Sequence, residues 1–175
     1  MTPSARDDAR LIKQICDREQ LLLAVAESVS VGHLQSLLAS TPGASTFFRG
    51  GATTYSIDEK TRLLRVDAAH AASVNCVSPR VTAEMARGIA ALFQVQIGVA
   101  TTGYVDPIPD PDSGMIQPHA YYAIWDGGDR SSGLMQGGDR ERVACQAFYA
   151  ESALHHLRHY LETRYGLASS SEIGG

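Results

Sequence analysis

The fold is decided by the stretch Leu21-Leu22-Leu23-Ala24-Val25-Ala26-Glu27-Ser28, an apolar run that ends in two polar residues. Residues 21–26 have the length of a buried strand, and apolar residues return with helical spacing over residues 32–40. Ser28 is therefore expected at a turn from a strand into a helix. Backbone N–H groups at a helix start lack partners within the helix and can hold an anion, so Ser28 is a candidate nucleophile beside a candidate oxyanion site.

A candidate base for Ser28 follows the next strand-like run, residues 47–55, which leads to Lys60. A serine hydroxyl needs a base to remove its proton, and a lysine can serve if burial or a neighbouring cation lowers its pKa. The hydroxyl of Tyr55 could relay or orient that proton. Two ordinary roles compete with this interpretation, because serines at helix starts are mostly N-caps and lysines in a first helical turn are mostly solvated.

Helical and strand-like segments alternate along the whole chain. Helices are expected over residues 5–18, 32–40, 58–64, 68–74, 79–93 and 139–165, and strands over residues 21–26, 47–55, 95–102, 120–125 and 131–136. Asp139 is the expected cap of the last helix, and the Pro- and Asp-rich residues 104–118 predict a long loop. This order predicts the α/β class, as a single-domain α/β/α sandwich with a mixed sheet over residues 1–167 and a mobile tail over residues 168–175.

Composition limits the possible partners. A net charge of −4 over 175 residues, without a basic cluster, argues against nucleic acid. No apolar run reaches the roughly 20 residues needed to cross a bilayer, and the polar start is no signal peptide, so we expect a cytoplasmic protein without a membrane partner. Cys16, Cys76 and Cys145 are odd in number and widely spaced, which favours reduced, buried thiols over disulfides or a zinc site. We expect a homo-oligomer.

Several motifs in a fixed order resemble those of one family. Residues 26–32 resemble A-E-S-C-T-G-G, residues 41–45 D-x-P-G-S-S, residues 49–60 R-G-F-V-T-Y-S-N-E-A-K, residues 77–86 A-V-S-E-E-T-A-x-E-M-A, and residues 138–140 G-D-R. Over about residues 8–165 the chain is similar to the CinA C-terminal domain family, whose characterised members are nicotinamide-nucleotide amidases. Ordered motifs together are far more specific than any one of them.

The resemblance implies a site as well as a fold. It implies that Ser28, Lys60 and Tyr55 are catalytic, that nicotinamide mononucleotide is deamidated to nicotinate mononucleotide and ammonia, and that neither a metal nor a cofactor is needed. The other implied residues are the oxyanion and pocket residues Ser30, Val31 and Gly32, and the substrate-binding residues Thr102, Gly103, Tyr104 and Arg140. Arg140 would clamp the phosphate.

Departures from the family motifs support a second hypothesis. Val31 replaces a glycine and disfavours a positive φ, and the family's glycine-rich loop T-G-I-A-G-P-G-G is replaced by residues 102–110, which carry Asp106 and Asp110. The chain would then be an inactive relative that keeps the fold but binds another small ligand or a protein partner.

Two further clusters have ordinary explanations as well as functional ones. His155 and His159 are spaced one helical turn apart, with Glu151 and Glu162 nearby in the sequence. This spacing suits metal ligands, and it equally suits the polar face of a helix. The aspartates at 106, 110 and 112 lack the EF-hand spacing, so a solvated acidic loop is the default there.

Overall fold

A five-stranded mixed sheet is the middle layer of the computed structural model, which describes residues 1–112 and 114–166. In spatial order its strands are β2 (Phe48–Thr53), β1 (Leu23–Glu27), β3 (Ile97–Gly103), β6 (His119–Asp126) and β7 (Asp129–Gln136). β1 runs parallel to both β2 and β3. β6 is antiparallel to β3, and β7 to β6. All five residues of β1 are buried, as expected for a central strand covered on both faces.

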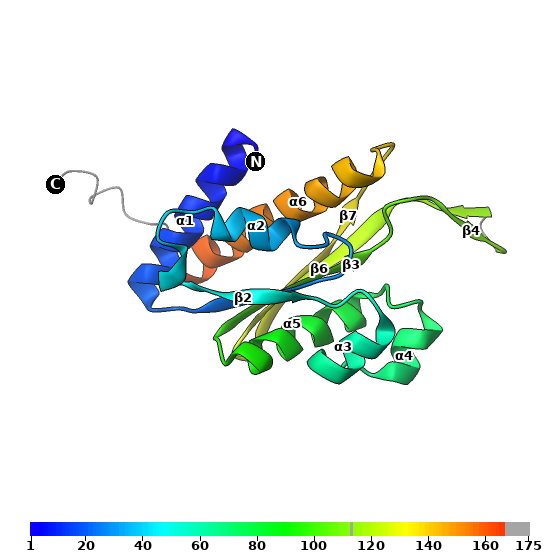
Figure 1. Ribbon diagram of the computed structural model, residues 1–175, viewed down its shortest axis with the longest axis horizontal. Coiled ribbons are helices and arrows are strands. Elements are labelled where there is room, and N and C mark those ends of the chain that lie inside the picture. Colours follow the sequence, from blue (N-terminus) through cyan, green and yellow to red (C-terminus); the bar gives the residue numbers. More distant parts are fainter. Residues whose placement is uncertain (113, 167–175) are drawn as a thin grey trace.

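Helices cover both faces of the sheet (Figure 1). One face carries α1 (Pro3–Glu19), α2 (His33–Ala39) and α6 (Arg142–Tyr165), and the other carries α3 (Ile57–Leu64), α4 (Ala68–Ser73) and α5 (Pro79–Phe93). A 3₁₀ turn (Ala44–Thr46) lies between α2 and β2. Each face has its own buried apolar cluster, so the predicted α/β/α sandwich with a mixed sheet is confirmed.

Two local predictions are corrected. The predicted loop over residues 104–118 contains a short hairpin of β4 (Ile108–Asp110) and β5 (Gly114–Ile116), which projects beyond the main sheet in Figure 1. Strands of three residues are too short to show an alternating pattern. Asp139 is not the cap of the last helix, because α6 begins at Arg142. Arg140 instead donates to the Gly137 carbonyl at 2.6 Å, which holds residues 137–140 in a turn.

The three cysteines are free; Cys16 and Cys145 are buried, whereas Cys76 is partly exposed. The predicted tail over residues 168–175 lies outside the described residues. Among the helices within residues 1–112 and 114–166, none is both long and apolar enough to cross a membrane.

The parallel part of the sheet positions the candidate site. The carboxyl ends of β2, β1 and β3 meet at one edge of the sheet, and the candidate residues Ser28, Tyr55 and Tyr104 follow them. The chain leaves β1 towards α2 on one face and leaves β2 towards α3 on the other. Connections that diverge in this way open a crevice between adjacent strand ends, which is where open α/β sheets bind ligands.

Candidate active site

A cavity of about 480 Å³ lies at this edge of the sheet. Its polar lining includes Ser28, Lys60, Asn75, Thr102 and Arg142, and part of its wall is apolar, with Val29, Ile57 and Val77. The volume is within the range of pockets that bind small molecules. Sequence segments that follow three different strands therefore share one ligand-sized space.

Ser28 and Lys60 lie in hydrogen-bond contact inside this cavity. Lys60 Nζ donates to Ser28 Oγ at 3.0 Å, and also to the backbone carbonyls of Thr54 at 2.8 Å and Tyr55 at 3.1 Å. Ser56 caps α3 by accepting from the Glu59 N–H at 3.2 Å, so Lys60 lies in the first helical turn and reaches back across the strand end. The predicted meeting of the two side chains is confirmed.

The surroundings of Lys60 favour its neutral form. The side chain is only 1% exposed, and burial lowers the pKa of its amine from the usual 10.5. Lys60 also lies in the first turn of α3, where the positive end of the helix dipole disfavours the protonated amine and so lowers its pKa further. Within the described residues no carboxylate forms an ion pair with Lys60. A neutral amine has two N–H groups for the two carbonyls, which leaves its lone pair for the Ser28 hydroxyl.

The side chain of Glu27 binds the N–H groups at the start of α2, where an oxyanion site was expected. Its carboxylate is fully buried and accepts hydrogen bonds from Ser30 Oγ at 2.6 Å and from the backbone N–H groups of Gly32 at 2.9 Å, Leu34 at 3.1 Å and Gln35 at 2.8 Å. The N-terminus of α2 therefore already holds an anion that belongs to the protein. The expectation of unpartnered N–H groups at this helix start is wrong for Gly32, because the carboxylate occupies that N–H.

The turn between Glu27 and Gly32 offers other donors. In the part of the chain that the structure describes, the N–H groups of Val29, Ser30 and Val31 have no protein acceptor. Val29 lines the cavity, whereas Val31 does not, so the valine that replaces the family's glycine does not close the pocket. The Ser30 side chain is fully buried, where it bonds Glu27 and Thr101.

Val31 is a strained residue whose replacement we expect to stabilise the protein. Its φ of 43° lies in the left-handed region, which a β-branched side chain rarely adopts. Val31→Gly should remove backbone strain on the order of 1–3 kcal/mol from the folded state. Glycine also makes the unfolded chain more flexible, which offsets part of this gain, so the free energy of unfolding should rise by about 1 kcal/mol. Urea unfolding of both proteins measures this difference. Val29→Gly, at a neighbouring valine of negative φ, is the control and should lower stability instead. A lower stability of Val31→Gly would contradict the strain argument.

The hydroxyl of Tyr55 contacts Arg142 and does not contact the Ser28–Lys60 pair for which it was predicted. Its side chain is 62% exposed, and its hydroxyl lies 3.4 Å from Nη2 of Arg142. Within the described residues that hydroxyl makes no hydrogen bond to Ser28 or Lys60. The contact of Tyr55 with Lys60 is made by its backbone carbonyl. A proton relay through the phenol is therefore not what this geometry supports.

The predicted substrate-binding residues divide into two groups. Thr102, Gly103 and Tyr104 all line the cavity. The Thr102 hydroxyl donates to the Cys76 carbonyl at 2.9 Å, and the Tyr104 hydroxyl accepts from Asn75 at 3.2 Å, so both fasten the segment after α4 to the end of β3. Arg140 does not line the cavity.

Arg142, and not the predicted Arg140, lines the cavity. The Arg140 guanidinium stacks on the Phe148 ring, 3.7 Å from its centroid. Arg142, two residues later, lines the cavity and pairs with Asp106. Neither Glu27 nor Arg142 was singled out by sequence reasoning as a site residue. Glu27 carried one signal, since it is an acidic residue directly at the end of a fully apolar run.

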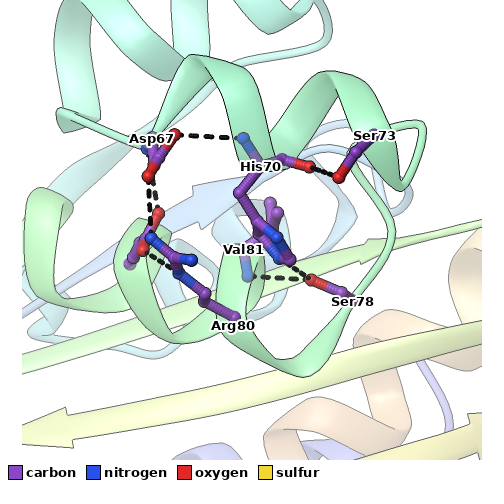
Figure 2. Close-up of polar contacts among 7 residues, drawn as sticks. Asp67, His70, Ser73, Ser78, Arg80 and Val81 are labelled. Carbon is purple, nitrogen blue, oxygen red and sulfur yellow. Dashed lines mark hydrogen bonds and ion pairs between the residues drawn. The ribbon is translucent and has the colours of Figure 1, made fainter.

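A second group of serine, histidine and aspartate lies outside the cavity, at the starts of α4 and α5 (Figure 2). His70 Nε2 lies 3.1 Å from Ser78 Oγ, which also accepts the Val81 N–H at 3.1 Å. Asp67 accepts the backbone N–H of His70 at 3.0 Å and an Arg80 N–H at 2.8 Å. A catalytic triad needs the carboxylate on the imidazole itself, and here Asp67 and Ser78 instead cap α4 and α5.

The polar face of α6 is used for packing against α1. Glu151 accepts from the Thr2 backbone N–H at 3.1 Å and its hydroxyl at 3.2 Å, and His155 Nδ1 lies 3.2 Å from Asp8. Glu162 pairs with Arg158. The two glutamates and His155, which a metal site on this helix would need, are therefore already bonded to other protein groups.

The sequence and fold match known proteins. The model of the CinA C-terminal domain matches residues 6–161. A "CinA-like protein" from Frankia casuarinae is 37% identical over 139 residues, which cover 79% of this chain and 31% of the relative. A "CinA-like protein" from Geobacter sp. is 34% identical over 148 residues, covering 82% of this chain and 34% of the relative. The chain thus spans about a third of the length of these curated relatives.

Solved structures share the same fold. A crystal structure of a competence-damaged protein (CinA) superfamily protein from Enterobacter cloacae matches with a TM-score of 0.83 at 22% identity, covering 92% of this chain and 94% of that one. Competence/damage inducible protein CihA from Agrobacterium tumefaciens matches with a TM-score of 0.83 at 23% identity, covering 93% and 98%. At such identities the likeness concerns the fold alone.

Proposed function

The chain belongs to the CinA C-terminal domain family, and on that premise we propose that it is an amidohydrolase that deamidates nicotinamide mononucleotide. The observation that carries the proposal is the contact between Lys60 Nζ and Ser28 Oγ at 3.0 Å in a ligand-sized cavity. A buried amine with a lowered pKa can serve as the base that activates a serine hydroxyl for attack on a carboxamide.

The proposed reaction has two steps. Neutral Lys60 accepts the hydroxyl proton while Ser28 Oγ attacks the carboxamide carbon, and the backbone N–H groups of Val29 and Ser30 donate to the developing oxyanion. The Lys60 ammonium then protonates the leaving nitrogen as the C–N bond breaks, which releases ammonia. Water, deprotonated by the same amine, hydrolyses the acyl-enzyme and frees nicotinate mononucleotide and the serine hydroxyl.

The other cavity residues support a flat heteroaromatic substrate. The apolar side chains of Val29, Ile57 and Val77 and the ring of Tyr104 line the cavity that contains Ser28. A pyridine ring against such a wall would bury apolar area and hold its carboxamide near the nucleophile. Tyr55 and Arg142 line the exposed side of the same cavity.

Ammonia release tests the proposal. Wild-type protein incubated with nicotinamide mononucleotide should yield ammonia and nicotinate mononucleotide in equal amounts, measured by a coupled ammonia assay and by chromatography. Absence of both products would contradict the amidase. Saturable binding of the nucleotide without products would favour the second candidate, a family member that binds a ligand without turnover. The replacement of the family's glycine-rich loop by residues 102–110, which carry Asp106 and Asp110, supports that candidate.

The pH dependence follows from the role of Lys60. Because burial lowers its pKa from 10.5, the neutral base is populated at a lower pH than in an ordinary lysine. We expect kcat/KM to rise with pH through that lowered pKa and to level off above it, since protonated Lys60 cannot accept the Ser28 proton. The measurement is kcat/KM across pH. An activity that falls over the same range as pH rises would contradict a lysine base.

A further inference from the structure

Arg142 brings three distant segments together at the exposed side of the cavity. The residue opens α6, and its guanidinium forms an ion pair with Asp106, which follows β3, at a sequence separation of 36 residues. Its Nη2 lies 3.4 Å from the hydroxyl of Tyr55, 87 residues away in the sequence. The guanidinium thus lies between the loop after β2 and the loop after β3.

Arg142 is also the cation that an anionic ligand could use. Of the described residues that line the cavity, Lys60 and Arg142 carry the cationic groups, and none carries a carboxylate. Lys60 is buried, bonded to Ser28 and two carbonyls, and needed in its neutral form. A negatively charged part of a ligand in this cavity therefore has Arg142 as its positive partner.

The ion pair with Asp106 is of a kind that a ligand can replace. The side chains of Arg142 and Asp106 are 50% and 56% exposed, and ion pairs so open to water contribute little to stability. A phosphate monoester carries more negative charge than one carboxylate, and its oxygens match the forked guanidinium in a bidentate arrangement. Charge and geometry therefore both favour a phosphate over Asp106 as the partner of the Arg142 guanidinium.

We propose that Arg142 makes the cavity specific for substrates that bear a phosphate monoester, and that Asp106 holds the guanidinium until the phosphate replaces it. The inference rests on the proposed amidase function, because it names the part of that substrate that the site recognises. It assigns the phosphate to Arg142 and not to Arg140, whose guanidinium stacks on Phe148.

The first experiment compares nicotinamide mononucleotide with nicotinamide riboside, the same molecule without its phosphate. Arg142→Gln should raise KM for the nucleotide at least about tenfold with little change in kcat, and should leave the kinetics of the riboside unchanged. Arg140→Gln is the matched control and should not alter the preference between the two. If the Arg140 variant alone loses the preference, the assignment to Arg142 is wrong.

The second experiment tests the competition by Asp106. Asp106→Asn should lower KM for the nucleotide severalfold and leave the riboside unchanged, because the guanidinium loses its internal partner. Asp112→Asn removes a carboxylate from the same stretch of chain without touching the Arg142 pair, and it should behave as wild type. If the KM for the nucleotide is unchanged in Asp106→Asn, the proposal that the phosphate displaces Asp106 from Arg142 is wrong.

Equilibrium binding separates this inference from the proposed reaction. Calorimetric titration with nicotinate mononucleotide, nicotinate riboside and inorganic phosphate requires no turnover. If no ammonia is released but wild type prefers the nucleotide and Arg142→Gln does not, the amidase fails and the phosphate specificity stands. Equal affinity of wild type for nucleotide and nucleoside, equal weakening of both in Arg142→Gln, or no binding of any of the three ligands would overturn the inference.

Discussion

Lys60→Met is expected to lower kcat/KM of the proposed amidase by at least about 10³-fold, because the side chain stays unbranched but loses its terminal amine, the base. Burial favours this test, since methionine fits an apolar site and the removed amine is almost fully enclosed. The protein should remain folded, as judged by circular dichroism and urea unfolding. The carbonyls of Thr54 and Tyr55 lose a donor, so a modest loss of stability is expected.

Ser28→Ala should cause a loss of the same size. Residues that act as a unit are not additive, so the double variant Ser28→Ala with Lys60→Met should be no slower than the slower single variant. Lys13→Met is the matched control, since Lys13 pairs with Asp17 on α1 and does not line the cavity. Wild-type kcat/KM in Lys60→Met, or losses that multiply in the double variant, would contradict a Ser28–Lys60 pair.

Glu27→Ala is expected to lower the free energy of unfolding by about 3–5 kcal/mol. The carboxylate is fully buried and accepts hydrogen bonds from Ser30 and from three backbone N–H groups at the start of α2. Alanine would remove this acceptor from the three N–H groups, which are buried or partly buried, and would leave the Ser30 hydroxyl with Thr101 alone. Glu27→Gln keeps one acceptor oxygen and should lose less. The measurement is urea unfolding at neutral pH.

The control for this prediction is Glu59→Ala. Glu59 is 42% exposed and pairs with Arg62 at the surface of α3, so its removal should change the free energy of unfolding by no more than about 0.5 kcal/mol. If Glu27→Ala loses no more stability than Glu59→Ala, the carboxylate does not support the start of α2. Lower activity in Glu27→Gln without a comparable loss of stability would show that Glu27 acts on the orientation of Ser28.

The prediction of the fold from sequence was accurate where the signal was local. The apolar run before Ser28 predicted β1, and the pair Ser78-Pro79 predicted the start of α5, where Ser78 accepts the Val81 N–H at 3.1 Å. Capping and apolar spacing depend on residues within one or two turns of one another. The β4–β5 hairpin is missed because its strands are short. The start of α6 is misplaced because residues 137–140 form a turn, in which Arg140 donates to the Gly137 carbonyl, ahead of the helix.

The amino-acid sequence by itself determined the family, the order of the six α-helices and of the five strands of the main sheet in the described residues, and the residue types needed for a serine and lysine pair. Only the tertiary structure decided which groups meet. Lys60 reaches Ser28 across 32 residues, Arg142 and not Arg140 lines the cavity, and Glu27 takes the Gly32 N–H, one of those expected for an oxyanion. The physical reason is that hydrogen bonds and desolvation act through space. Residues two positions apart on the chain can therefore face different surroundings, and burial, which lowers the pKa of Lys60, exists only once the strands and helices have packed.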